Sequence, residues 1–300
     1  RHKAACSALW QELAKRDEIY LGHYEGWYAV RDEAFYGPDE LTERDGVKYA
    51  PSGAPVEWVR EPSYFFRLSK WLPELLRRYD FPEGHPERID VQPEARRNEV
   101  RAFVQQGLKD FADKPEKLDL SISRTSFTWG VKVPGDEAHV MYVWLDALTN
   151  YLTALDWQND GADYSTYWPC DLHMVGKDIL RFHAVYWPAF LMSAGIALPK
   201  TVFGHGFLLN RGEKMSKSLG NVVAPQKIIQ QNGAEILRLW VASSDFTEDL
   251  RIGPEIVNAA AVSYRRLRNT IRFMLANLAD FDEQERLAPS AMPELERFML

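Results

Sequence analysis

Hydrophobic and polar positions along the 300-residue chain alternate between the period of a helix and that of a strand. Residues 1–18 carry alanine and leucine at helical spacing and predict an amphipathic helix. The region that follows, up to about Arg60, is rich in aromatic residues and predicts a small module of short strands. Residues 62–79 return to helical spacing, with an interruption expected at Pro73. Polar helices are expected from there to about Phe111.

Strand-like and helical segments alternate in the second half of the chain. The stretches at 118–124, 139–144 and 171–175 have strand character, and the last two lead directly into helical patterns. Such alternation is typical of a parallel sheet in an α/β protein. Two further helices, at 225–243 and 254–277, begin with proline. We therefore expect an α/β domain followed by a helical one.

The stretch GHGFLLNRGEKMSKSLGNV, residues 204–222, contains the clearest candidate for chemistry. It follows a β-branched and aromatic run at 201–203 and precedes a helix that begins at Pro225. Its two lysines, Lys214 and Lys217, lie between glycines, which predicts a loop that is free to close on phosphate. Each charge-assisted contact contributes about 1.5–3 kcal/mol, and contacts aimed at a departing group lower the reaction barrier. A solvated basic loop is the alternative interpretation.

Two of the predicted helices are expected to line a crevice. Each carries three residues on one face, at i, i+3 and i+7 in the first helix and at i, i+4 and i+8 in the second: Trp144, Ala147 and Tyr151, then Ile179, His183 and Trp187. If both preceding strands belong to one parallel sheet, the two faces meet at its carboxyl edge. An aromatic crevice with one histidine suits a thioether. Ordinary core packing would explain the same spacing.

Composition and charge restrict the possible functions. The net charge of −7 argues against a protein that coats nucleic acid, so RNA contact requires a local basic patch. Cys6 and Cys170 lie far apart without CxxC spacing, which predicts a reduced, cytoplasmic chain with no disulfide and no thiolate zinc site. The longest apolar stretch, 184–198, is too short to cross a membrane. A basic stripe that is either solvated or a backbone contact for RNA consists of Arg265, Arg268 and Arg272.

KMSKS at residues 214–218 resembles the signature loop of class I aminoacyl-tRNA synthetases. Four other stretches are similar to the methionyl-tRNA synthetases: YEGWY, SYFFRLSKW, VWLDALTNY and GKDILRFHAVYW. After about residue 220 the stretches LRLWVASSDFTEDLRIGPEI and YRRLRNTIRFMLANLADFD resemble isoleucyl-tRNA synthetases instead. The resemblance covers nearly the whole chain. It implies a cytoplasmic ligase that uses ATP with Mg²⁺ to form methionyl-adenylate and transfers methionine to tRNA, with no membrane or DNA partner.

The same resemblance implies roles for individual residues. Lys214 and Lys217 would be catalytic and would stabilise the phosphate transition state and the leaving pyrophosphate. The ATP-binding residues would be His205, Gly206, Lys214, Met215, Ser216, Lys217 and Ser218. The methionine-binding residues would be Arg124, Trp144, Ala147, Tyr151, Asp178, Ile179 and His183. The helical domain would meet tRNA, with Arg265, Arg268 and Arg272 as the binding residues.

The domain organisation implied by the resemblance has four parts. Residues 1–19 would be a helix of a truncated nucleotide fold and 20–117 a connective insertion. Residues 118–222 would form the Rossmann-like second half with the KMSKS loop, and 223–300 a truncated helical domain of the tRNA- or anticodon-binding type. The fold class expected is thus α/β: the second half of a Rossmann-like parallel sheet with a connective insertion, followed by a C-terminal α-helical domain.

The sequence departs from the family pattern in two places. The family's CxxC positions appear as residues 29–32 and about 50–53, which predicts a metal-free knuckle and no structural zinc. The His-x-Gly-His-type turn and the first half of the nucleotide fold are missing, so we expect the chain alone to be inactive or very weak. Residues 20–117 leave no room for the editing domain that isoleucine selection requires, which favours methionine. An isoleucyl-type ligase and a non-catalytic tRNA-binding paralogue remain the alternatives.

Overall fold

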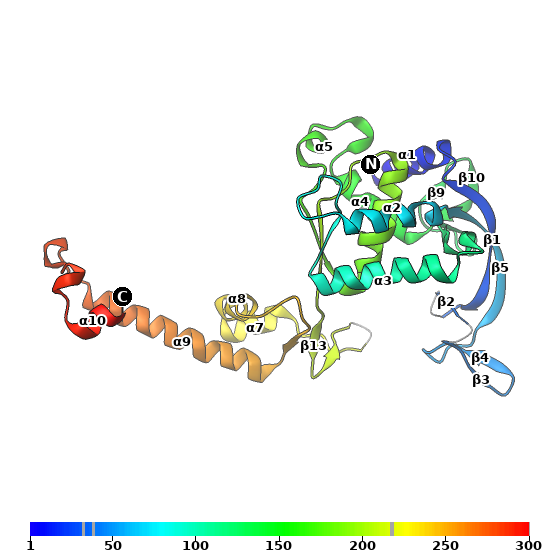
Figure 1. The fold of residues 1–300 in the computed structure, drawn as a ribbon. Coiled ribbons are helices and arrows are strands. Elements are labelled where there is room, and N and C mark those ends of the chain that lie inside the picture. Colours follow the sequence, from blue (N-terminus) through cyan, green and yellow to red (C-terminus); the bar gives the residue numbers. More distant parts are fainter. Residues whose placement is uncertain (32–33, 38–39, 217–218, 300) are drawn as a thin grey trace. The chain divides into compact units, whose positions relative to one another are not determined.

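The computed structural model describes residues 1–31, 34–37, 40–216 and 219–299 (Figure 1). Two residues of the predicted signature loop, Lys217 and Ser218, lie outside the described residues. The chain divides into two compact units, residues 1–205 and residues 206–300. The described part contains no helix long and apolar enough to cross a membrane.

The first unit opens with a helix and an antiparallel sheet. Helix α1 (His2–Lys15) buries one apolar face, as the spacing over 1–18 predicts. The sheet has the order β2-β1-β5-β7. Strands β3 and β4, which come between β2 and β5 in the sequence, form a separate hairpin. These strands confirm the aromatic β-module, and their bounds are β1 (Ile19–Ala29), β2 (Ala34–Tyr36), β3 (Thr42–Arg44), β4 (Val47–Tyr49), β5 (Glu57–Phe66) and β7 (Leu120–Ser121).

The helix predicted over residues 62–79 is wrong at its start. Residues 62–66 are the end of β5 and pair with β1 in the long curved ribbon of Figure 1. Strand pairing satisfies their backbone groups and overrides the helical spacing. Helix α2 (Leu68–Asp80) follows and continues past Pro73, where an interruption was expected. Its face of Leu68, Leu72, Leu75 and Tyr79 is buried, which holds the helix together across the proline.

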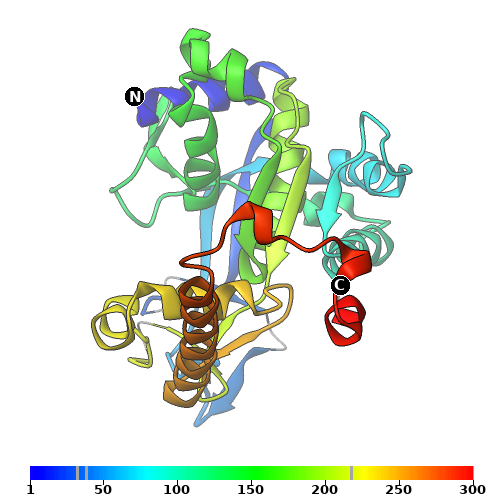
Figure 2. The same ribbon diagram turned by 90° about the vertical axis from the view of Figure 1, so that its left-hand side faces the viewer.

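Three strands form the parallel sheet of the first unit, in the order β11-β12-β6. They are β11 (Leu172–Gly176), β12 (Thr201–His205) and β6 (Asp90–Gln92), of which β11 and β12 run side by side in Figure 2. Strand β10 (Asp136–Met141) lies outside this sheet and pairs antiparallel with β8 (Ser123–Arg124) and β9 (Lys132–Val133). The expectation that both strands before the crevice belong to one parallel sheet is therefore wrong, because the strand before residue 144 belongs to another sheet.

Helices surround these sheets and share one core. They are α3 (Glu94–Asp110), α4 (Val143–Ala154), α5 (Ala162–Tyr167), α6 (Trp187–Ala194), the 3₁₀ turns η2 (Pro115–Leu118), η3 (Trp157–Asn159) and η4 (Lys177–Ile179), and the π-helical turn η5 (Phe182–Tyr186). Large fully buried side chains of the core include Phe66, Tyr79, Trp187 and Phe190. Because α1, α2, α4 and α6 all contribute to this core, the helix faces that carry candidate residues are firmly placed.

The second unit combines a small sheet with helices. Strands β13 (Leu208–Asn210), β14 (Glu213–Lys214) and β15 (Leu250–Ile252) form the sheet. The helix predicted over 225–243 is divided at Gly233, whose φ of 89° interrupts the helical backbone. The helix predicted over 254–277 is confirmed at both ends. The helical elements are α7 (Pro225–Asn232), α8 (Ala234–Ala242), α9 (Pro254–Asn277), η6 (Glu283–Glu285), η7 (Pro289–Ala291) and α10 (Glu294–Met299).

Candidate substrate and nucleotide sites

Tyr151 on α4 and His183 in η5 form the central polar contact of the predicted methionine pocket. Nδ1 of His183 lies 3.0 Å from the carbonyl oxygen of Ile179, which can only accept, so Nδ1 carries the proton. Nε2 of His183 then accepts from the Tyr151 hydroxyl at 2.9 Å. Burial lowers the pKa of His183 and keeps the ring neutral. The histidine is thus held in one tautomer with both nitrogens satisfied.

Aromatic contacts complete the meeting of the two predicted faces. The ring of Trp144 stacks on Phe182 with centroids 3.6 Å apart and planes at 14°. Tyr151 lies against His173 with centroids 4.2 Å apart, and burial raises the pKa of the Tyr151 hydroxyl. Ala147 is half-buried on α4. The faces expected from spacing therefore do converge, although their preceding strands belong to different sheets.

His173 is a buried neighbour of this pocket that the sequence reasoning missed. It is 5% exposed on β11, and Sγ of Cys170 lies 3.7 Å from its Nε2. Burial, with a smaller contribution from His183, lowers the pKa of His173 to about 4. The available signal was the alternation of the strand, which places residues 173 and 175 on the inner face.

Asp178 and His205 lie where the parallel strands β11 and β12 end. Gly176 and His205 are paired at the ends of these strands. A Cβ added to Gly176 would lie 2.6 Å from Oδ1 of Asp178 and 3.7 Å from Cε1 of His205. The glycine therefore lets the carboxylate and the imidazole approach the same point of the chain. Ligands of open α/β sheets bind at this edge.

Arg124 on β8 is held by the protein itself. Its Nη1 donates to Oγ of Ser121 at 2.5 Å and to the carbonyl oxygen of Ser123 at 2.8 Å. Its Nε lies 3.7 Å from Oε1 of Glu61, and the guanidinium lies over the Tyr142 ring. Arg124 also lines a cavity of about 510 Å³. The guanidinium is preorganised, and its nearby carboxylate partially offsets its charge.

The signature stretch begins as a hairpin in the second unit. Strands β13 and β14 pair antiparallel around Arg211 and Gly212, whose φ values of 54° and 85° give a tight two-residue turn. Lys214 is part of β14, paired with Leu209, and its Nζ lies 4.0 Å from the centroid of the Phe207 ring. The sequence predicts a loop position for this lysine, whereas the structure places it on a strand.

Asn221 ties the described part of the loop together. Its Oδ1 accepts from the backbone N–H of Ser216 at 2.8 Å, and its Nδ2 donates to the carbonyl oxygen of Lys214 at 3.1 Å. The Asn221 carbonyl accepts from Nδ2 of Asn210 at 2.7 Å. Met215 is packed against the core of the second unit. These contacts fix the backbone at Lys214 and Ser216.

The comparisons with known proteins decide the family. A family model described as tRNA synthetases class I (M) matches residues 1–258. The chain belongs to this family. A methionine–tRNA ligase of Brucella suis is 48% identical over 100% of this chain and 56% of that protein. The corresponding ligase of Rickettsia conorii is 56% identical over 80% of this chain and 44% of that protein.

Solved structures of synthetases from this family are also similar. Mycobacterium tuberculosis methionyl-tRNA synthetase in complex with methionyl-adenylate matches with a TM-score of 0.79 and 46% identity, covering 93% of this chain and 53% of that one. A second structure of that enzyme, bound by methionyl-adenylate, gives 0.73 and 48%, covering 86% and 48%. The chain thus spans about half the length of the relatives it matches.

In this synthetase chain Gly206 has a structural requirement of its own. A Cβ at residue 206 would lie 2.1 Å from the carbonyl oxygen of Glu248, and the Gly206 N–H donates to the carbonyl oxygen of Phe246 at 3.0 Å. Close approach of two backbone segments therefore demands glycine here. A role in holding ribose would be additional to this packing.

The predicted tRNA-binding arginines lie on one helix of this synthetase chain. Arg265, Arg268 and Arg272 are all exposed on α9, and the continuous helix places them on one face. Nε of Arg265 donates to the carbonyl oxygen of Ala261 at 3.4 Å. The stripe is available to an anionic backbone.

Proposed function

We propose that this protein is a methionine–tRNA ligase. It would activate methionine with ATP, accompanied by Mg²⁺, to methionyl-adenylate and transfer the aminoacyl group to tRNA in the cytoplasm. The family membership supports this reaction class, and two solved structures of one relative, at 46% and 48% identity, contain methionyl-adenylate. The observation that carries the assignment is the Tyr151–His183 contact, which lies among the rings of His173 and Trp187.

The pocket chemistry supports methionine as the amino acid. Trp144 and Tyr151 supply aromatic surface, and a thioether sulfur gains about 0.3–1.5 kcal/mol at an aromatic edge. Neutral His183 adds polarity without a charge that an apolar side chain would have to desolvate. Ala147 and Ile179 would limit the width of the site, and Asp178 and Arg124 would lie near the charged α-groups.

The nucleotide would be bound by residues from the strand end and the signature loop. His205 and Gly206 would face adenine and ribose, while Lys214 and Lys217 would neutralise charge on the phosphates in the transition state. Met215 and Ser216 would contribute to ATP binding from the base of the loop. Ser218 would also bind ATP. The contacts of Asn221, which fix the backbone at Lys214 and Ser216, support this role for Lys214.

The basic stripe of α9 would hold the tRNA backbone. Three exposed arginines on one face suit phosphate contacts that fix orientation without reading sequence. The logarithm of the affinity falls as the logarithm of the salt concentration rises, and each phosphate neutralised steepens this slope by roughly 0.7–0.9. Replacement of all three by glutamine should therefore weaken tRNA binding and flatten its salt dependence.

The other candidate functions receive less support. The Brucella suis methionine–tRNA ligase matches the chain along its whole length, including the residues after 220 that resemble isoleucyl enzymes. An isoleucyl-type ligase is therefore not favoured. A non-catalytic tRNA-binding paralogue would have no use for a neutral histidine held against a tyrosine in an aromatic pocket.

Amino-acid-dependent ATP–pyrophosphate exchange tests the proposal. Methionine, isoleucine, leucine and valine are compared with the chain alone and with the N-terminal half of a methionine–tRNA ligase supplied in trans. We expect exchange with methionine only, and in the complemented reaction. Exchange with isoleucine instead, or none in either reaction despite tRNA binding, would contradict the assignment.

A further inference from the structure

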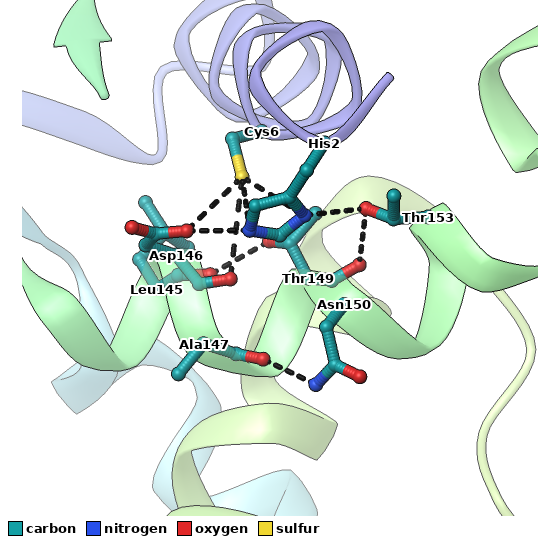
Figure 3. Close-up of polar contacts among 8 residues, drawn as sticks. All are labelled: His2, Cys6, Leu145, Asp146, Ala147, Thr149, Asn150 and Thr153. Carbon is teal, nitrogen blue, oxygen red and sulfur yellow. Dashed lines mark hydrogen bonds and ion pairs between the residues drawn. The ribbon is translucent and has the colours of Figure 1, made fainter. Parts of the chain in front are cut away.

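Three side chains with metal-binding atoms lie close together in the first unit, and none of them is among the residues predicted to bind methionine. His2 and Cys6 project from α1, and Asp146 projects toward them from α4 (Figure 3). Nε2 of His2 lies 2.6 Å from Oδ1 of Asp146, and Sγ of Cys6 lies 3.5 Å from that nitrogen and 3.7 Å from that oxygen. Imidazole, thiolate and carboxylate are the ligands that zinc takes in proteins.

Thr153 determines which nitrogen of His2 faces the cluster. Its hydroxyl lies 3.0 Å from the carbonyl oxygen of Thr149 and 2.8 Å from Nδ1 of His2. When the hydroxyl donates to that carbonyl, which can only accept, Nδ1 of His2 donates to Thr153. Nε2 then faces Oδ1 of Asp146 at 2.6 Å, a separation spanned by a shared proton that a bound metal ion would replace.

We propose that His2, Cys6 and Asp146 bind one divalent transition-metal ion of the zinc type, with water in the fourth position. Bonds of about 2.0–2.3 Å in a tetrahedral site hold ligand atoms about 3.3–3.7 Å apart. Both sulfur separations already fit this range. The His2–Asp146 separation must open by about 0.7 Å to reach it, and both side chains are partly exposed and able to move.

Binding is balanced by proton release. The Cys6 thiol loses its proton to solvent as the sulfur–metal bond forms, and the proton shared by His2 and Asp146 leaves as the nitrogen–metal and oxygen–metal bonds form. The contact from Thr153 to the far nitrogen of His2 is the outer-shell hydrogen bond that metal-bound histidines usually make. Nothing is oxidised or reduced.

The ion would join α1 to α4, the helix that carries Trp144 and Tyr151. It would therefore stabilise the helix from which the pocket is built. This proposal departs from the prediction of no thiolate zinc site, which rests on the spacing of the two cysteines alone and does not consider His2 and Asp146. The signal in the sequence is the i, i+4 spacing of His2 and Cys6 on one helix face, a common arrangement for two ligands.

Cobalt titration of the purified protein tests the site, because a Co²⁺–thiolate bond absorbs in the near ultraviolet. We expect one equivalent to saturate this band and Zn²⁺ to displace it. Cys6→Ala should abolish the band, whereas Cys170→Ser, which changes the other cysteine of the chain, should retain it. Absence of the band in the unaltered protein, or its persistence in Cys6→Ala, overturns the proposal.

A milder variant protects the test against misfolding. Thr153→Val keeps the side-chain shape and removes the outer-shell hydroxyl, so we expect metal affinity to fall about 10–100-fold. Zn²⁺ should raise the melting temperature of the unaltered protein and of Cys170→Ser, because it binds the folded state. A melting temperature indifferent to Zn²⁺, with no cobalt–thiolate band, would show that His2 and Asp146 share only a proton.

Discussion

The Tyr151 hydroxyl donates to Nε2 of His183 across 2.9 Å and links α4 to the π-helical turn η5. The other nitrogen of His183 is committed to Ile179, so the tyrosine is the donor for Nε2. This arrangement fixes one polar contact among aromatic side chains. It also makes the pair sensitive to removal of a single oxygen atom.

Tyr151→Phe should weaken methionine binding. The substitution leaves the buried Nε2 of His183 without its donor, at a cost of about 1–3 kcal/mol, and the freed ring can change its position. We expect the methionine Kd to rise about 10-fold or more by isothermal titration. Tyr164→Phe, on α5, is the matched control and should bind as the unaltered protein does. An unchanged Kd in Tyr151→Phe would show that this contact does not contribute to methionine binding.

Lys214→Ala should slow adenylate formation with little effect on methionine affinity. Loss of one preorganised positive group at a transition state costs about 10²–10³ in kcat. The measurement is methionine-dependent pyrophosphate exchange in the complemented reaction. Lys227→Ala removes an ammonium group from α7 of the same unit and should keep normal turnover. Equal losses in the two variants would indicate only a general effect of charge.

Asn221→Ala should loosen the base of the signature loop. The side chain makes two hydrogen bonds to the backbone, with Ser216 and Lys214, each contributing about 0.5–1.5 kcal/mol. We expect hydrogen-exchange protection of the Ser216 amide to fall about 10-fold. The loss of pyrophosphate-exchange activity should be smaller than in Lys214→Ala. Asn232→Ala at the end of α7 should leave that amide protected. Retained protection in Asn221→Ala would locate the restraint elsewhere.

Acidification should destabilise the first unit through His173. Burial lowers its pKa from 6.5 to about 4, so between these values the unfolded chain binds a proton that the folded chain does not. The free energy of unfolding therefore rises with pH across this window and falls as pH drops from 6.5 to 4. The full difference is about 3 kcal/mol. Urea unfolding at successive pH values measures it.

His173→Phe is the variant that isolates this effect. A phenyl ring keeps the contact with Tyr151 and removes the titrating group, so the dependence of stability on pH should flatten between pH 4 and 6.5. His23→Gln changes an exposed histidine of β1 and should preserve the slope. If the slope is equally steep in His173→Phe, acid sensitivity arises from other groups.

Much of the candidate site could be predicted from the sequence because its signals are local. The helix over 254–277 and its arginine stripe follow from an uninterrupted pattern that begins at a proline. The faces of Trp144 and Tyr151, and of Ile179 and His183, follow from helical spacing. The signature stretch is contiguous in the chain and needs no tertiary information to be found.

The tertiary structure decided which of these local patterns prevail and which faces meet. Residues 62–66 satisfy a helical spacing but pair with β1, because neighbouring strand backbone outweighs a weak local preference. The pairing of β10 with β8, outside the parallel sheet, depends on tertiary structure. So does the approach of Cys6 to Asp146, which lie more than a hundred positions apart in the chain. A sequence records the preferences within each element, whereas packing and long-range hydrogen bonds select the partners of each face.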